Sequence, residues 1–241
     1  MSGSRALERA SFTGLDALLL DAGNTLVFLD HEVVAQVARD AGLDFAAEAL
    51  CVAESRAKRD YDALLAAGGA HEDGWSLYFV ALFGALGVDE PRARAIVPAL
   101  RSAHDRLNLW RRVPEGVREA LSRARAAGVL LGVVSNSEGK LDALFAHVGL
   151  SEYFVAVVDS AHEGVRKPDP EIFRRALARI GVPASRAMYV GDLPSVDVDG
   201  ARAAGMRAVL VDPLAHYPHY ADAPRVDSVV EVLDAIVAAR A

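Results

Sequence analysis

The sequence predicts an α/β fold: a parallel β-sheet covered by helices on both faces, with an all-helical insert after the first strand. Short, continuous apolar runs recur and alternate with amphipathic helical stretches, as is typical of strands buried on both faces of a parallel sheet. The helical stretches end at glycine, a common left-handed helix cap. Between residues 29 and 111 the apolar strand runs stop and helical periodicity continues alone.

The expected strands end in small or acidic polar residues. The first, LDALLLD, ends at Asp21 with no helix before it. The other four follow Gly-terminated helices, and their segments are AAGVLLGVVSN to Ser135 and Asn136, HVGLSEYFVAVVDS to Asp159 and Ser160, RIGVPASRAMYVGD to Asp192, and AAGMRAVLVD to Asp212. Ligands of such sheets bind outside the carboxyl ends of the strands. We therefore expect one shared cleft that contains Asp21, Ser135 and Asp192, with Asp159 as a further candidate, although Asp and Ser also form turns and cap helices.

The insert divides the chain into two parts. Its four helical runs are expected at residues 31–41, 45–65, 74–86 and 91–110, with no strand between residues 29 and 111. Pro91 suits the first turn of the last helix. Helices of the sheet domain resume at residues 114–128. The predicted domains are therefore residues 1–28 with 112–241, and the helical insert at residues 29–111.

Composition narrows the classes of function. The chain has 241 residues, of which 52% are hydrophobic and 24% charged, and its net charge is −7. This charge argues against a nucleic-acid partner, which requires clustered Lys and Arg. The single cysteine, Cys51, excludes an internal disulfide and is expected to be buried packing. The amino-terminal segment has no signal-peptide core and no apolar run is long enough to span a membrane, so we expect a cytoplasmic protein without a membrane partner.

Three acidic residues are expected in the same cleft. Asp21, Asp192 and Asp197 would repel one another there, and a hard divalent cation with oxygen ligands, such as Mg²⁺, relieves that repulsion. Gly191 lets the backbone approach closely before Asp192. Lys167 stands before two prolines at a helix start, where it can neutralise a carboxylate and a phosphoryl oxygen, although most lysines are simply solvated.

Four segments together resemble the haloacid dehalogenase-like hydrolase superfamily. They are DAGNT (residues 21–25), VVSNS (133–137), RKPDPEIF (166–173) and YVGDLPSVD (189–197), in this order and with a helical insert after the first. The resemblance covers residues 15–212. It implies a Rossmann-like catalytic core and identifies the insert with the family's helical cap of the first type.

The resemblance also implies roles for single residues. Asp21 would be the nucleophile and a metal ligand, with the Gly23 carbonyl as a second ligand. Thr25 would help to hold the loop after the first strand. Ser135 and the Asn136 backbone would bind the transferred phosphoryl group. Lys167 would orient Asp21 and stabilise charge. Asp192 would bind Mg²⁺, and Asp197 would bind it directly or through water.

Position 23 departs from the family's phosphatases, which usually have a second Asp there as general acid and base. Gly23 has no side chain to move a proton, and such catalysis contributes roughly 10²–10⁴-fold. A phosphatase of this kind is expected to be slow, to favour good leaving groups, or to borrow another donor. The candidates are Asp30, His31, Glu32, His71 and His104, each of which is more often a solvated helix residue.

The leading hypothesis is a Mg²⁺-dependent phosphohydrolase that forms an aspartyl-phosphate from a small phosphorylated metabolite, as a monomer or homodimer. A 2-haloacid dehalogenase also lacks the second Asp, but the family's dehalogenases use no metal and have a Tyr at position 23. A phosphoryl-ligand binding protein with weakened catalysis is the third hypothesis. Phosphonate cleavage, the fourth, needs a Schiff-base lysine in the cap, where Lys58 is the sole lysine.

Overall fold

The core of the protein is a six-stranded parallel sheet. The structure is a computed structural model that describes residue 7, residues 12–68 and residues 71–240. The strand order is β5-β4-β1-β6-β7-β8, and every paired neighbour is parallel. The strands are β1 (Ala17–Leu20), β4 (Leu130–Ser135), β5 (Ala156–Asp159), β6 (Ala187–Gly191), β7 (Arg207–Val211) and β8 (Arg225–Val226). The predicted fold class is confirmed.

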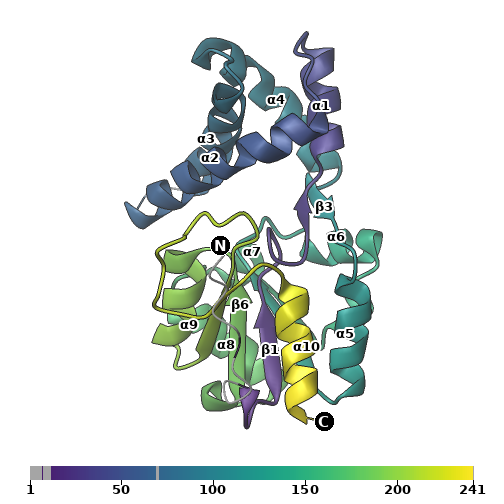
Figure 1. Ribbon diagram of the computed structural model, residues 1–241, viewed down its shortest axis with the longest axis vertical. Coiled ribbons are helices and arrows are strands. Elements are labelled where there is room, and N and C mark those ends of the chain that lie inside the picture. The colour runs from purple at the N-terminus through teal and green to yellow at the C-terminus, as the bar shows by residue number, and fades with distance from the viewer. Residues whose placement is uncertain (1–6, 8–11, 69–70, 241) are drawn as a thin grey trace. The chain divides into compact units, whose positions relative to one another are not determined.

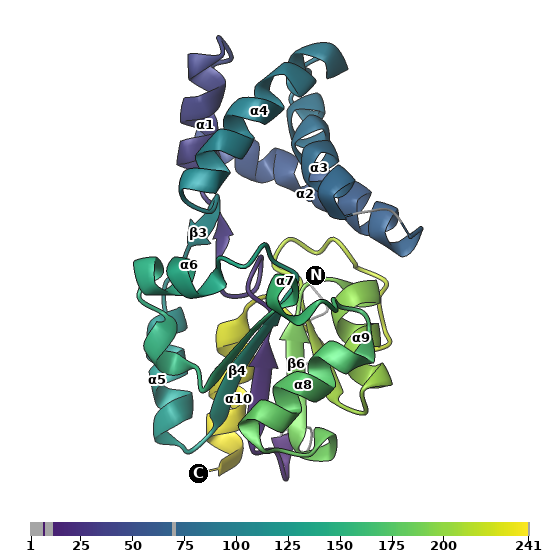
Figure 2. The same ribbon diagram turned by 180° about the vertical axis from the view of Figure 1, so that it is seen from behind.

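Helices cover both faces of the sheet because the central strands are apolar on both sides. All residues of β1 and β6 are buried. Figure 1 and Figure 2 show α5 (Val117–Ala126) and α10 (Val229–Arg240) on one face and α8 (Pro170–Ile180) on the other. Side chains of α8 and α9 (Asp199–Ala203) share one apolar cluster with Leu19 of β1 and Tyr189 of β6.

Short elements connect the strands and helices. They are α6 (Leu141–Val148), η2 (Ser151–Tyr153), α7 (Ser160–Glu163), η3 (Ala184–Arg186) and η4 (Pro194–Val198), which is a single π-helical turn. Gly149 after α6 and Gly181 after α8 adopt the left-handed conformation expected of glycine caps.

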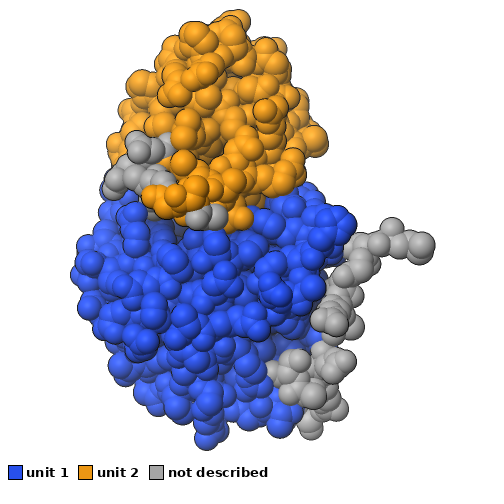
Figure 3. Space-filling view, turned by 90° about the vertical axis from the view of Figure 1, so that its left-hand side faces the viewer, with its two compact units in different colours: residues 1–28, 112–241 blue, residues 29–111 orange. Residues whose placement is uncertain are grey.

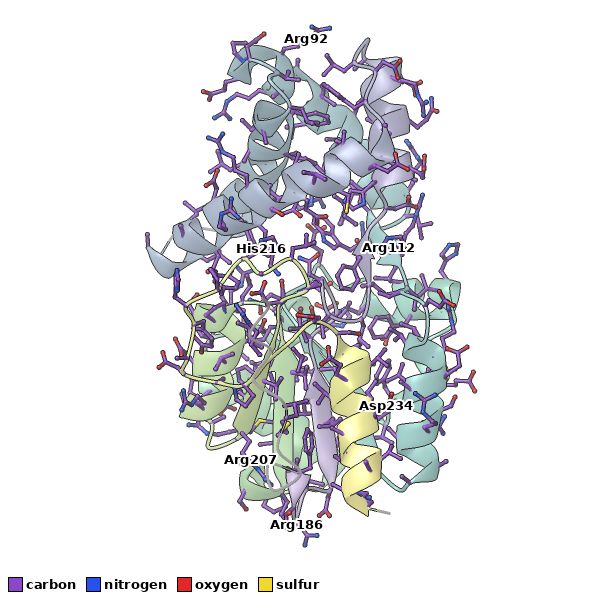
Figure 4. All side chains as sticks on the ribbon, in the orientation of Figure 1. Arg92, Arg112, Arg186, Arg207, His216 and Asp234 are labelled. Atoms are coloured by element: carbon purple, nitrogen blue, oxygen red, sulfur yellow. The ribbon has the colours of Figure 1, made fainter. Side chains whose placement is uncertain are left out.

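The two ends of the strands carry different polar residues. At the amino ends of β6 and β7, Arg186 bonds Asp16 at 2.6 Å and Arg207 bonds the Thr13 carbonyl at 3.2 Å. Figure 4 labels both arginines at this edge and labels His216 in the loop beyond the carboxyl end of β7. The buried carboxylates of the sheet domain lie at the carboxyl ends, as the strand pattern predicts.

The chain forms two compact units, residues 1–28 with 112–241 and residues 29–111, which Figure 3 colours blue and orange. The second unit contains α1 (His31–Asp40), α2 (Ala47–Ala66), α3 (His71–Ala85) and α4 (Glu90–Arg106). Its own apolar core includes Leu50, Phe79 and Leu100, all fully buried. The helical insert after the first strand is thereby confirmed.

Three local predictions are wrong. Residues at both ends of the insert form strands, since β2 (Phe28–Leu29) pairs with β3 (Trp110–Arg112). Accordingly α4 ends at Arg106, because Leu107 is extended with φ −158° and ψ 126°. Cys51 is half-buried on α2, rather than buried.

Among the described residues, no helix is both long enough and apolar enough to cross a bilayer.

Candidate active site

Three neighbouring strands deliver polar residues to one edge of the sheet. The Asp21 amide, one residue beyond β1, donates to the Val190 carbonyl at 2.8 Å and so continues the pairing with β6. Ser135 ends β4, and Asp192 directly follows β6. The strands β4, β1 and β6 are adjacent in the sheet. These three residues therefore lie side by side at the carboxyl ends of the strands, as the sequence predicts.

A cluster of three carboxylates lies at this edge. Oxygens of Asp21, Asp192 and Asp197 all lie within 4.8 Å of one another, and the three residues are buried. Asp197 Oδ2 accepts from the amides of Asp192 and Leu193, both at 2.9 Å. These bonds fold η4 back onto the end of β6. The donor set is all oxygen, which suits a hard divalent cation.

Gly191 is required for this close fold. A Cβ at position 191 would lie 2.4 Å from Asp197 Cγ, well inside the contact distance of real side chains. The glycine before Asp192 therefore lets the Asp197 carboxylate lie against the strand backbone, which agrees with the close approach predicted from the sequence.

Lys167 lies among the carboxylates and is 4% exposed. Its ammonium group donates to Asp21 Oδ1 at 2.5 Å, to Asp197 Oδ1 at 2.7 Å and to the Tyr189 hydroxyl at 2.8 Å. A lysine has three N–H donors, so protein acceptors use all of them in this structure. Lys167 thus holds the nucleophile candidate directly, and a phosphoryl oxygen would have to displace one of these partners.

Burial sets the protonation behaviour of this cluster. It raises the pKa of Asp21 to about 7, the positive charge of Lys167 opposes this rise, and the negative charges of Asp197 and Asp192 add to it. Burial alone would lower the pKa of Lys167, but the charges of Asp197 and Asp21 outweigh it and hold that pKa above its ordinary value. The pair therefore consists of a firmly charged lysine and a carboxylate whose charge still needs compensation.

The Asn136 side chain has a structural role that the sequence pattern does not indicate. Its side-chain amide donates to the Lys167 carbonyl at 2.9 Å and accepts from the Lys167 amide at 2.8 Å. This two-point contact fixes the backbone of the segment that presents the lysine. The expected contact of the Asn136 backbone with a phosphoryl group remains a prediction. Ser135, 6% exposed, lies beside it at the end of β4.

Two further strand-end acids bind the backbone and do not join the cluster. Asp159 accepts from the amides of Gly139, at 3.0 Å, and of Ala161, also at 3.0 Å, so it caps α7 and ties down the loop after Ser135. Asp212 accepts from the amides of His216 and Tyr217. The contacts of both residues are those of an Asp that forms a turn or caps a helix, which was the alternative to a place in the cleft.

Backbone hydrogen bonds hold the loop after Asp21. The Leu26 amide donates to the Ala22 carbonyl at 2.9 Å, and the Asn24 amide donates to the Val27 carbonyl at 2.8 Å. Thr25 is 1% exposed and, within the described residues, its hydroxyl makes no hydrogen bond. The loop therefore does not depend on a hydrogen bond from the Thr25 side chain.

Most candidate proton donors of the insert are engaged inside their own unit. Asp30 caps α1 through the Val33 amide and pairs with Arg111 at 2.8 Å. His31 bonds Glu54 at 2.7 Å. His104 is buried and its Nδ1 accepts from the Leu109 amide at 3.3 Å. Glu32 is exposed in the first turn of α1, and the side chain of His71 lies outside the described residues.

A family model for haloacid dehalogenase-like hydrolases matches residues 15–205. The chain belongs to this family. A phosphoserine phosphatase of Thermus thermophilus is 41% identical over 123 residues, which cover 50% of this chain and 47% of that protein. Haloacid dehalogenase-like hydrolase domain-containing protein 3 of Bos taurus is 34% identical over 208 residues, 82% of each chain. The chain spans about half the length of the Thermus phosphatase. It likewise spans about half the length of haloacid dehalogenase-like hydrolase domain-containing protein 3 of Mus musculus.

Solved structures share the fold over nearly the whole chain. The HAD-hydrolase YfnB of Bacillus subtilis, in a crystal form bound to magnesium, superposes with a TM-score of 0.62 at 17% identity and covers 92% of this chain and 98% of its own. A dehalogenase superposes with a TM-score of 0.62 at 25% identity and covers 92% and 97%. The relatives and solved structures thus include both a phosphatase and a dehalogenase, so the chemistry must be argued from the residues of the site.

Proposed function

We propose that the protein is a Mg²⁺-dependent phosphohydrolase that acts on a small phosphorylated molecule through an aspartyl-phosphate on Asp21. One observation carries the proposal: Lys167 holds Asp21 at 2.5 Å, while oxygens of Asp192 and Asp197 lie within 4.8 Å of its carboxylate. A lone nucleophile would not require two more buried acids beside it.

The metal would be held by Asp21, Asp192 and Asp197, with the Gly23 carbonyl as a further ligand. Three carboxylates and one lysine leave an excess of two negative charges when all are ionised, which a divalent cation matches. Bound Mg²⁺ would supply charge neutralisation for the nucleophile and for the phosphoryl oxygens.

The residues of the chain would perform two displacements. In the first, an Asp21 oxygen bonds phosphorus, the phosphorus–oxygen bond to the leaving group breaks, and the leaving oxygen takes up a proton. In the second, water bonds phosphorus, the bond between Asp21 and phosphorus breaks, and the water proton is released as inorganic phosphate forms. Ser135 would donate to a phosphoryl oxygen, Asn136 would position Lys167 and present its own backbone, and Lys167 would keep the Asp21 carboxylate oriented.

Gly23 makes the first displacement dependent on the leaving group. Because position 23 offers no proton, esters whose leaving groups are stable as anions should react fastest. Residues 29–111 are proposed to act as the cap that selects small substrates. The named activity of the Thermus relative, a phosphoserine phosphatase, supports a phosphorylated metabolite as the substrate class.

A screen of phosphate esters, with Mg²⁺ and with a chelator, tests the proposal, and a 2-haloacid serves as a control. We expect phosphate release that needs Mg²⁺ and is fastest on aryl phosphates, with no halide release. Halide release without metal would identify a dehalogenase instead. Metal-dependent binding of phosphorylated ligands without turnover would identify a binding protein.

A further inference from the structure

Tyr189 places a hydroxyl group inside the sheet domain, directly beside the site. Its side chain is fully buried, and the residue lies in β6 three positions before Asp192. The hydroxyl lies 2.7 Å from the Val134 carbonyl and 2.8 Å from Lys167 Nζ. A carbonyl only accepts and an ammonium only donates. The single hydroxyl hydrogen therefore goes to Val134, and the oxygen accepts from Lys167.

This acceptor completes the coordination of the lysine. Two of the three N–H groups of Lys167 go to Asp21 and Asp197, and the third goes to Tyr189. Asp197 Oδ1 lies farther from the hydroxyl, at 3.3 Å, and competes only weakly for its hydrogen. The direction of the Tyr189 bond thus fixes the rotation of the ammonium group about its stem.

We propose that Tyr189 is a positioning residue that holds the Lys167 ammonium in the orientation in which it bonds Asp21. Its kinetic consequence rests on the proposed function, whereas its effect on Lys167 does not. The hydroxyl is tied to the end of β4 through Val134, so the strand next to Asp21 sets the position of the lysine. Tyr189 adds no charge to the site, because the group that accepts the hydrogen bond from Lys167 is a neutral phenol.

Tyr189→Phe removes the acceptor for Lys167 together with the donor to the Val134 carbonyl, and it keeps the ring. The ring packs edge-on against Phe173, with centroids 4.9 Å apart and an interplanar angle of 85°, and a phenylalanine ring can keep that contact. One buried N–H of Lys167 would then lack its acceptor, so the ammonium would reorient. We expect kcat on an aryl phosphate to fall about tenfold while KM changes less than about twofold.

A measurement on Lys167 itself tests the proposal without relying on turnover. The chain has three lysines, Lys58, Lys140 and Lys167, so ¹⁵N-lysine labelling gives a simple spectrum of side-chain ammonium groups. Lys167→Arg assigns the signal of Lys167. We expect Tyr189→Phe to shift or broaden that signal and to leave the other two unchanged. Tyr153→Phe, at a buried tyrosine of η2, is the matched control and should leave all three unchanged.

The outcomes separate this inference from the proposed function. If the wild type hydrolyses no ester, the proposed function fails and the lysine signal alone decides the role of Tyr189. An unchanged Lys167 signal in Tyr189→Phe would overturn the inference, as would an unchanged kcat in an active enzyme. Loss of the Mg²⁺-dependent rise in melting temperature in this variant would also overturn it, because the hydroxyl would then act through the carboxylates.

Discussion

At the scale of single residues, the charge around Asp21 determines what the edge of the sheet can bind. Burial makes unbalanced charge costly. Burial is the main reason that the pKa of Asp21 is raised to about 7; the charge of Lys167 opposes the rise, and the negative charges of Asp197 and Asp192 add to it. Lys167 alone therefore does not balance the cluster. A divalent cation would restore full ionisation of Asp21 and so prepare it as a nucleophile.

Asp21→Asn tests the nucleophile. An amide does not attack phosphorus usefully, so we expect kcat on an aryl phosphate to fall by several orders of magnitude, as for other removed nucleophiles. Initial rates with saturating Mg²⁺ measure this. Asp142→Asn, at an exposed position in the first turn of α6, should keep the wild-type rate. Turnover retained in Asp21→Asn would remove Asp21 from the mechanism.

Gly23→Asp tests the missing proton donor. A carboxyl group at this half-buried position could protonate the leaving oxygen, so hydrolysis of an alkyl phosphate should rise at least about tenfold. Hydrolysis of an aryl phosphate should change less, because its leaving group needs no proton. Gly23→Asn has nearly the same shape but no acidic proton and is the control. Equal alkyl rates in the two variants and the wild type would mean that another group already supplies the proton.

At the scale of elements, the link between β6 and η4 builds the metal site. The strand ends at Gly191, and the turn returns so that Asp197 accepts from the amides of Asp192 and Leu193. Gly191→Ala would force a Cβ to within 2.4 Å of Asp197 Cγ. We expect this variant to lose about 1–3 kcal/mol of stability and to bind Mg²⁺ more weakly, as thermal melts with and without Mg²⁺ would reveal.

Gly84→Ala supplies the matched comparison for that prediction. Gly84 lies inside α3, and a Cβ there meets nothing within 4 Å. Alanine is the better helix residue by about 1 kcal/mol, so this variant should melt at the same or a higher temperature and keep its response to Mg²⁺. If Gly191→Ala melted like Gly84→Ala and kept the same response to Mg²⁺, then close packing of Asp197 on the strand would contribute neither to stability nor to Mg²⁺ binding.

Elements with a strong local pattern were predictable from the sequence, and short ones were not. β1, β4, β6 and β7 are continuous apolar runs, which periodicity identifies. β8 has two residues and β2 also has two, too few for any pattern. The end of α4 is not predictable from local composition, because helical composition continues to Trp110, whereas the chain is extended at Leu107 and then pairs as β3 with β2.

The site was predictable where strand ends bring residues together, and less so where a side chain reaches across the fold. Asp21, Asp192 and Asp197 gather as expected. The contact of Asn136 with the backbone of Lys167 joins residues 31 positions apart, and local pattern carries no information on it. The sequence does not single out Tyr189, because a tyrosine in an apolar strand resembles any other buried core residue. Its position two residues before Gly191 is the one feature that could have indicated a place near the site.

At the scale of the whole molecule, every proposed metal-binding and lysine contact belongs to the unit of residues 1–28 and 112–241. The contributing positions lie far apart in the chain but meet in one sheet. Both tryptophans of the chain, Trp75 and Trp110, belong to the other unit. Far-UV circular dichroism, which includes the sheet, is therefore the appropriate probe for the effect of metal, since tryptophan fluorescence reports the helical unit.

Mg²⁺ should stabilise the sheet domain, because an ion that binds only the folded state shifts the equilibrium by mass action. At a concentration about 100 times its dissociation constant, the gain is about 2.7 kcal/mol, which for a chain of this size raises the melting temperature by roughly 5–10 °C. Asp197→Asn should abolish the rise, and Asp234→Asn, at a half-exposed position of α10, should preserve it. An equal rise in Asp197→Asn and the wild type, or no rise in either, would show that this carboxylate cluster does not bind Mg²⁺.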